Sequence, residues 1–427
     1  MQEREVEVKS KNGVSIYQYK NCALHSFYIS LFVRAGCMYE REGELGITHF
    51  LEHALIRNVN KLYGMKLYSM LDRQGLEFNA GTYSEMVQFY ISGSSEHFRQ
   101  GADIITRLPS PIVLSKEEID SERRRIKAEI RESNDRTSLA SFSGKAVFEN
   151  TALSHSIVGA NKDVDRMSAA SLERYRKRVM TGERIFFYVT GSFTDEDIEY
   201  LLGLVDSLSL SEESTERCDN VAEVPPSFGK RALAVHIKNA DYTKLRFTFD
   251  LDMTRYSIAE TDLLYDMLLS GYNSKLFIEL SEKRGLFYDI GGASERYKNI
   301  GTLYFTFEVK ERDLYEAVAL TVEILNSLKN TETVENEIIK AGYVDNALML
   351  LDDCRELNFT FAYDNHIMSE GYATVAERRD RYEGIDARRL CEMASEIFRA
   401  NNLTLTMKTC KKRADEQKIK ELIGGLV

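Results

Sequence analysis

The two halves of the chain show the same order of sequence signals, and this repeat limits the folds that the chain can adopt. Each half has a β-rich apolar run, a helical stretch, a K-L-aromatic-x-x-L segment that leads into Gly-Leu, two further strands and a long helical run. The Gly-Leu pairs, Gly75-Leu76 and Gly285-Leu286, lie about 210 residues apart. Several matches in one order indicate a duplicated domain. Strands mixed with long helices favour an α+β domain, in which helices cover a mostly antiparallel sheet.

The repeated signals can be placed by number. In the first half, the apolar run lies at 26–36, the K-L segment with its two strands at 66–93 and the helical run at 116–132. In the second half, the strand lies at 244–253, a helix at 257–270, the K-L segment with its strands at 275–309 and the long helical run at 333–351. Periods of 2 and 3.6 in the apolar residues support these assignments.

One stretch near the midpoint is typical of a linker. Residues 209–220 are polar and acidic, with few periodic apolar positions, and Pro225-Pro226 follows them. Such composition favours an extended connection over a packed element. We therefore expect an N-terminal domain over 1–213, a linker over 214–230 and a homologous C-terminal domain over 231–427.

Composition excludes several classes of protein. The chain has no run of 18 apolar residues, so we expect no membrane span and no membrane partner. Its start, MQEREVEVKSKNG, has no apolar signal segment, which predicts a cytoplasmic protein. A net charge of −11 argues against nucleic acid as a partner. The six cysteines are scattered without a C-x-x-C pair, a pattern that suits reduced thiols.

The segment GITHFLEHALIR contains the pattern H-x-x-E-H. On an α-helix His49 and His53, four residues apart, share a face and can bind one metal ion. Glu52 projects from nearly the same face and can reach a water bound to that metal. The alternative is a chance pair of helix histidines, but the chain has only seven His, so chance is a poor explanation. The motif therefore favours a metal site.

A catalytic zinc site needs a third protein ligand. The charged helical stretch at 115–132 offers several acids, of which Glu122 and Glu129 lie seven residues apart and hence on one face. The alternative is a solvated charged helix, which is the better interpretation for its other acids. Periodicity alone does not single out Glu129.

HFLEH, followed 76 residues after its last His by the second Glu of ERRRIKAE, resembles the pitrilysin/insulinase family of zinc peptidases, which includes mitochondrial processing peptidase. The resemblance implies Zn²⁺ as the cofactor and Glu129 as the third ligand. It implies that Glu122 orients a ligating imidazole. Family chains of about this length consist of two homologous α+β domains, of which the second has no metal motif.

Two further segments resemble family motifs. Residues 71–91 resemble a segment in which Asn79 and Ala80, on a sheet edge at 77–82, lie along an extended peptide substrate. On the residues alone, 79–82 is typical of a turn. Relatives often carry an aromatic residue at the position of Gly81, so this chain departs from them there.

Residues 276–288, LFIELSEKRGLFY, resemble a motif of the second half that supplies an Arg and a Tyr, seven apart, for contact with substrate. Tyr288 matches the Tyr, but Ser281 stands where the Arg is expected. Ser cannot replace the charge and forked donors of a guanidinium. Arg284, only four residues before Tyr288, is expected to point elsewhere, although it is also the residue that could bend in.

These patterns predict a zinc-dependent endopeptidase that hydrolyses peptides or unfolded segments, with a zinc-bound water activated by Glu52. We expect a homodimer, or a heterodimer with a paralog that carries the Arg–Tyr pair. The alternative is a noncatalytic binding or assembly subunit that retains the peptidase fold. The intact H-x-x-E-H favours the enzyme, because a structural subunit has no need for Glu52.

Overall fold

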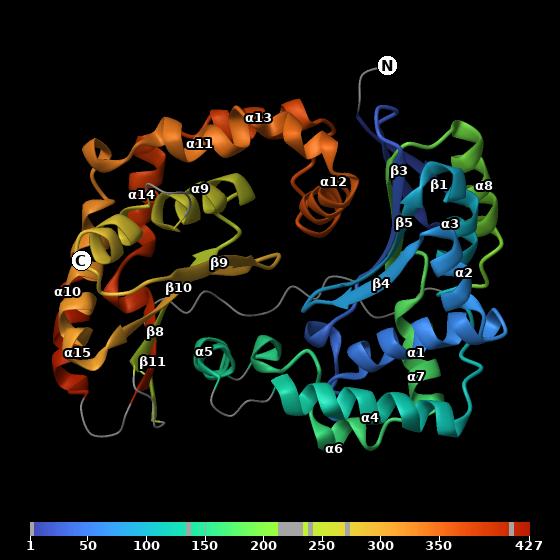
Figure 1. The fold of residues 1–427 in the computed structure, drawn as a ribbon, viewed down its shortest axis with the longest axis horizontal. Helices are drawn as coiled ribbons and strands as arrows, with labels where there is room; N and C mark the ends of the chain where they lie inside the picture. Colours follow the sequence, from blue (N-terminus) through green and yellow to red (C-terminus); the bar gives the residue numbers. More distant parts are fainter. Residues whose placement is uncertain are drawn as a thin grey trace. The chain divides into compact units, whose positions relative to one another are not determined.

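The computed structural model describes residues 4–133, 138–149, 151–211, 234–237, 242–269, 274–409 and 414–427 (Figure 1). These residues form two compact units. Unit 1 takes the described residues of 1–134, 155–220 and 348–375, and unit 2 takes those of 135–154, 221–347 and 376–427. The predicted linker, 214–230, lies outside the described residues.

Unit 1 is built on a six-stranded sheet with the order β1-β2-β6-β3-β5-β4. Its strands are β1 (Glu5–Lys9), β2 (Ser15–Lys20), β3 (Ser26–Val33), β4 (Glu77–Thr82), β5 (Val87–Ser94) and β6 (Ile185–Gly191). All neighbouring pairs are antiparallel except β2 and β6. The central strand β3 is apolar at most positions and is buried over seven of its eight residues. The sheet ends at β4, which places the site described below at a sheet edge.

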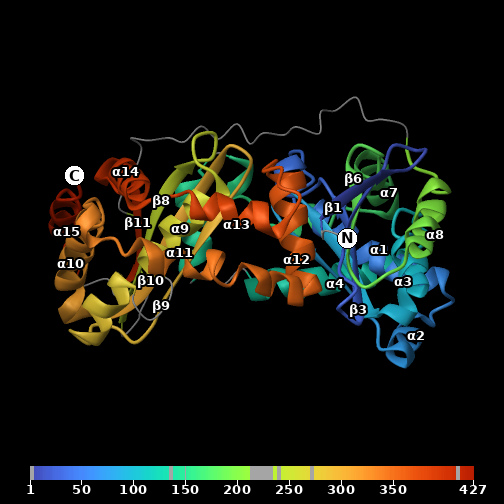
Figure 2. The same ribbon diagram turned by 90° about the horizontal axis from the view of Figure 1, so that it is seen from above.

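Helices cover both faces of this sheet. The helices of unit 1 are α1 (Ile47–Leu62), α2 (Leu67–Gln74), α3 (Phe98–Ile105), α4 (Lys116–Ser133), α6 (Asn161–Val164), α7 (Ala169–Val179), α8 (Asp195–Asp206) and α12 (Cys354–Phe361). Phe27, Ile29 and Leu31 of β3 face the core that α1 and α3 also line, and α8 lies beside α3 (Figure 2). On the opposite face, Asn358 of α12 is fully buried; its Oδ1 accepts from Ser30 Oγ at 2.7 Å and its Nδ2 donates to Tyr188 O at 2.9 Å.

Unit 2 repeats this plan. Its strands are β7 (Ala234–Ile237), β8 (Tyr242–Asp252), β9 (Ile290–Arg296), β10 (Ile300–Lys310) and β11 (Leu403–Thr409). Their order, β7-β11-β8-β10-β9, equals the order β2-β6-β3-β5-β4 of unit 1, and the first pair is again the parallel one. Its helices are α5 (Leu139–Val147), α9 (Ile258–Leu269), α10 (Leu314–Ser327), α11 (Asn336–Val344), α13 (Val375–Glu383), α14 (Ala387–Ile397) and α15 (Glu416–Ile423). The predicted α+β class with two homologous, mostly antiparallel domains is therefore confirmed.

The units differ from the contiguous domains expected from the sequence. Residues 135–154, with α5, belong to unit 2, whereas residues 348–375, with α12, belong to unit 1. The long helical run expected at 333–351 is also interrupted, because α11 ends at Val344 and a 3₁₀ segment (Ala347–Asp352) follows it. Leu348 and Met349, whose apolar side chains extended the helical pattern, are 69% and 65% exposed. Within the described residues, no helix combines the length and apolarity needed to cross a membrane.

Candidate metal and catalytic site

The helix that carries H-x-x-E-H has a fixed starting point. The carboxylate of Glu40 accepts hydrogen bonds from Gly46 N at 2.7 Å and Thr48 N at 3.0 Å, which satisfies amide groups left free at the helix N-terminus. Gly46 has φ 90°, and a Cβ there would lie 2.6 Å from the Cα of Gly159. This close approach requires glycine, and it sets where α1 begins.

One face of α1 packs into the core and the other carries the motif. Phe50, Ala54 and Leu55 are fully buried in the core of unit 1. His49 and Glu52 are each only 9% exposed, although both are polar. Buried polar groups need partners, and α4 and β4, which both contact α1, supply them.

Three side chains converge at this face. Glu129 Oε2 of α4 lies 3.4 Å from His49 Nε2 and 3.6 Å from His53 Nε2. Zinc bonds of about 2.0–2.1 Å in a tetrahedron place two ligand atoms roughly 3.3 Å apart. These distances, and the donor set of two imidazoles and one carboxylate, therefore fit a zinc ion. Among the described residues, only His49, His53 and Glu129 form such a cluster.

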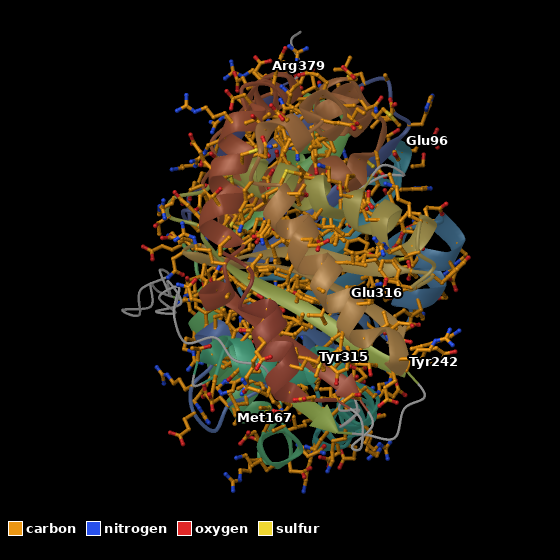
Figure 3. All side chains as sticks on the ribbon, turned by 90° about the vertical axis from the view of Figure 1, so that its left-hand side faces the viewer. Glu96, Met167, Tyr242, Tyr315, Glu316 and Arg379 are labelled. Atoms are coloured by element: carbon orange, nitrogen blue, oxygen red, sulfur yellow. The ribbon has the colours of Figure 1, made fainter. Side chains whose placement is uncertain are left out.

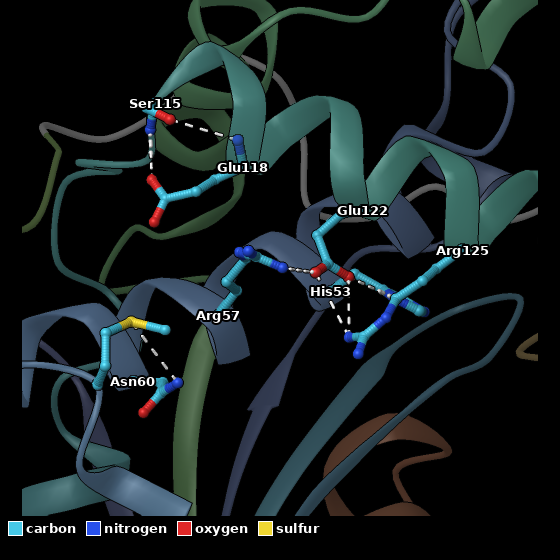
Figure 4. A network of polar contacts seen from close by, with 8 residues as sticks. His53, Arg57, Asn60, Ser115, Glu118, Glu122 and Arg125 are labelled. Atoms are coloured by element: carbon cyan, nitrogen blue, oxygen red, sulfur yellow. Dashed lines mark hydrogen bonds and ion pairs between the residues drawn. The ribbon is translucent and has the colours of Figure 1, made fainter.

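Glu122 supports this cluster from behind His53 (Figure 4). Its Oε2 lies 3.4 Å from His53 Nδ1, and its Oε1 accepts from Arg57 Nη1 at 2.5 Å. Burial opposes ionisation of Glu122, but the contacts with His53, Arg57 and Arg125 lower its pKa to about 2. An ionised Glu122 holds the proton of His53 on Nδ1, which leaves the Nε2 lone pair directed at the metal position.

The two histidines have different electrostatic surroundings. Burial, with a contribution from His53, lowers the pKa of His49 to about 4. Burial also acts to lower the pKa of His53, but the hydrogen bond with Glu122 and the charges of Glu52 and Glu129 outweigh it and raise the pKa. His49 Nδ1 is buried without a hydrogen-bond partner among the described residues, so packing orients this ring.

In the metal-free protein we expect these imidazoles to titrate far apart. His49 should remain neutral to a pH near 4, whereas His53 should keep its second proton above pH 6.5. Because that proton occupies Nε2, zinc affinity should fall as the pH is lowered through the pKa of His53 and rise as the pH is raised. Histidine NMR spectra of the metal-free protein measure both midpoints, and a His53 midpoint below 6.5 would contradict the expectation.

Glu52 is placed to act beside the cluster without belonging to it. Its Oε2 accepts a hydrogen bond from Thr82 Oγ1 of β4 at 2.5 Å. Burial raises the pKa of Glu52, while the Thr82 hydrogen bond and the charge of His53 act to lower it. A raised pKa makes the carboxylate a stronger base, which suits a group that accepts a proton near neutral pH.

Strand β4 lies at the edge of the sheet, next to Glu52. Residues 79–82, typical of a turn on the residues alone, belong to this strand and pair with β5 on one side. Asn79 Oδ1 accepts a hydrogen bond from Ala80 N at 2.9 Å. The ring of Tyr83 lies 3.4 Å from the point that a Gly81 Cβ would occupy, so Tyr83 fills part of the space of the missing aromatic side chain.

Comparisons with known proteins identify the family of the chain. A model of insulinase, peptidase family M16, matches residues 18–161, and a model of the M16 inactive domain matches residues 166–341. The chain belongs to peptidase family M16. The resemblance drawn from HFLEH and ERRRIKAE is thereby confirmed.

Relatives with M16-like sequences and structures extend over both units. An uncharacterized zinc protease of Rickettsia bellii is 26% identical over 340 residues, which cover 78% of this chain and 79% of the relative. Uncharacterized zinc protease YmxG of Bacillus subtilis is 22% identical over 395 residues, which cover 91% and 94%. A protease from Helicobacter pylori has the same fold, with a TM-score of 0.80 at 17% identity over 95% of this chain and 99% of that one.

The second M16 segment with a predicted role lies in unit 2. Tyr288 is 97% exposed and borders a cavity of about 780 Å³, which Lys244, Phe287, Phe307 and Lys310 also line. Ser281 Oγ donates to Phe287 O at 2.7 Å, so it braces its own loop. Arg284 Nη1 pairs with Glu316 Oε1 at 3.2 Å, as expected for a side chain that points elsewhere. Figure 3 labels Glu316 on the surface.

Sequence reasoning missed four contributors to this site. Arg57, four residues after His53, and Arg125, three after Glu122, could have been found from helical spacing. Thr82 and Tyr83 gave no signal, because their roles depend on the pairing of β4 with β5 and on the packing of α1 against β4.

Proposed function

We propose that this M16 protein is a zinc-dependent endopeptidase that hydrolyses peptides or unfolded segments. The observation that carries the proposal is the convergence of His49 Nε2, His53 Nε2 and Glu129 Oε2 beside a buried Glu52. Two neutral imidazoles and one carboxylate would hold Zn²⁺ with net positive charge and an open position. The M16 relatives named zinc proteases support the same assignment.

The chain's own residues supply the proton transfers. When bound, zinc would polarise the scissile carbonyl and make a water more acidic. Glu52 accepts the proton of the attacking water and then donates it to the leaving amine. Burial of His49 keeps that ring neutral and ready to bind metal, and Glu122 keeps a proton on His53 Nδ1, so His53 binds metal through Nε2 once the proton on that nitrogen has left.

The edge strand β4 is the proposed binding site of the substrate. An extended peptide can add to an exposed edge through main-chain hydrogen bonds, which gives affinity with little dependence on sequence. We assign Asn79 and Ala80 to this contact, and we propose Tyr288 separately as a substrate-binding residue. The exposed positions of Asn79 and Tyr288 support this assignment.

Metal analysis and a peptide assay test the function directly. Purified protein should contain one zinc per chain and hydrolyse quenched fluorescent peptides. A chelator should abolish hydrolysis, and added zinc should restore it. Protein that binds no zinc and cleaves no peptide, alone or with candidate partners, would rule out the proposal and favour the noncatalytic assembly subunit.

Ser281 leads to a proposal about the partner. Since Ser281 is committed to its own loop and Arg284 to Glu316, unit 2 offers no guanidinium seven residues before Tyr288. We propose that a paralog supplies the Arg–Tyr pair in a heterodimer. The isolated chain should then bind zinc but cleave slowly, and the partner should raise kcat/KM by about 10²-fold or more, because positioning of the substrate is restored.

Kinetics of the purified chain alone test this expectation. Ser281→Arg should recover part of the missing kcat/KM, whereas Glu282→Arg, which places the same guanidinium one residue away, should not. If the isolated chain hydrolyses peptides and a paralog does not increase its kcat/KM, the proposal of a heterodimer is ruled out.

A further inference from the structure

We propose that Thr82 is a positioning residue, which holds the Glu52 carboxylate from the strand that binds the substrate and so couples peptide docking to the orientation of the base. The inference rests on the proposed function and deepens it. Four observations support it: the contact itself, the burial of Glu52, the stiffness of threonine and the register of β4.

The contact makes Thr82 the support of Glu52. Thr82 Oγ1 donates to Glu52 Oε2 at 2.5 Å, and among the described residues no other side chain hydrogen-bonds to this carboxylate. Glu52 is 9% exposed, so water does little to hold it. A glutamate has three side-chain torsions, and without a partner the carboxylate would be free to turn. With Oε2 fixed by Thr82, Oε1 is left for proton transfer.

Threonine suits this task because its side chain is stiff. Two heavy atoms on Cβ restrict χ1, so the direction of the hydroxyl follows the backbone of the strand. The side chain of Thr82 faces α1, as do the neighbouring even-numbered positions Phe78 and Ala80, which pack on the core of unit 1. A displacement of β4 would therefore move the hydroxyl that holds Glu52.

The register places the backbone of the same residue at the free edge. Tyr83 N donates to Met86 O at 2.8 Å, which makes these two residues a hydrogen-bonded pair of the β4–β5 hairpin. In an antiparallel ladder such pairs alternate, so the amide groups of Thr82, opposite Val87, and of Ala80, opposite Phe89, point away from β5. A substrate strand would bind these groups, and Ala80 N–H is now occupied by Asn79 Oδ1.

Thr82 thus connects the substrate with the base, through its backbone on one side and its hydroxyl on the other. Main-chain hydrogen bonds from a docked peptide would fix the backbone of Thr82, whose hydroxyl fixes Glu52. Thr82 should therefore affect kcat through the base, while KM, which reflects mainly the main-chain contacts, should change little.

The test compares Thr82→Val and Thr82→Ser with the wild type in the zinc-loaded full chain. Thr82→Val keeps the shape but removes the donor, and we expect kcat to fall by about 10²-fold with KM little changed. Thr82→Ser restores the donor and should recover most of kcat. Zinc content should remain at one per chain in both variants.

Thr106→Val is the matched control. Thr106 is buried, whereas Thr82 is half-buried, and Thr106 Oγ1 donates to Ala102 O at 2.7 Å within unit 1, away from the site. Its substitution should lower the thermal midpoint by a similar amount without lowering kcat. If Thr82→Val does not fold, Thr82→Ala takes its place in the same comparison.

A second measurement separates positioning from substrate binding. In the Glu52→Gln background, Thr82→Val should leave the affinity for an uncleaved fluorescent peptide unchanged, and it should not lower the residual rate further. An unchanged kcat in an active Thr82→Val variant, or a loss of peptide affinity in the double variant, overturns the inference alone. A wild type without chelator-sensitive hydrolysis overturns the proposed function as well.

Discussion

Glu52→Gln should abolish peptide hydrolysis while one zinc ion remains bound per chain. The amide has the shape of the carboxylate but cannot take a proton from water, and loss of a general base costs about 10²–10⁴-fold in rate. Zinc should remain because the ligand atoms come from His49, His53 and Glu129. Steady-state kinetics with quenched peptides and metal analysis of the same sample measure both quantities.

Glu117→Gln is a suitable control for this variant. Glu117 lies in the first turn of α4, the helix that carries Glu129, but it is exposed to solvent. The same chemical change at this position should leave rate and zinc content unaltered. Full activity in Glu52→Gln would remove Glu52 from the mechanism, and loss of zinc would make it a ligand.

Glu129→Gln should differ from Glu52→Gln by losing zinc as well as activity. Glu129 Oε2 is the atom that lies close to both imidazoles, and an amide oxygen lacks the charge that offsets Zn²⁺. Loss of an outer partner of a ligand costs about 10–100-fold in metal affinity, so loss of the ligand itself should cost more. Competition with a zinc-binding dye measures the affinity, and circular dichroism checks that the variant is folded.

Glu132→Gln provides the comparison for this result. It lies on the same helix, three residues further on, and its side chain is exposed. Zinc affinity equal to that of the wild type is expected. Glu129→Gln protein that keeps zinc at wild-type affinity would exclude Glu129 from the ligand set.

Local patterns were enough to predict the duplication and the helix that carries H-x-x-E-H. The order of strands and helices repeats because the apolar residues of both units have the same periods and bury the same faces of their strands and helices. The two sheets have matching strand orders. The H-x-x-E-H spacing places three polar side chains on one helix face by geometry alone. Glu129 was different, since α4 has acids on several faces and only the family resemblance singled it out.

Contacts between segments that are distant in sequence could not be predicted from local patterns. Asn79 and Gly81 are turn residues by local preference, but pairing with β5 overrides that preference and makes residues 79–82 a strand. The apolar period of α12 shows that one face is buried, but it does not say against which sheet. Thr82 likewise has no distinguishing neighbours in sequence, because its role depends on a helix 30 residues away along the chain.

The exchange of segments between the units affects how the protein is made. The sheet that packs against α1 is covered on its other face by α12, where Asn358 and Ser30 are 328 residues apart in sequence. During synthesis the amino-terminal half therefore emerges with this face of the sheet uncovered. Polar groups on the face, such as the Ser30 hydroxyl, lack their partners in α12 until that helix has been translated. Unit 1 can reach its final form only after most of unit 2 has left the ribosome.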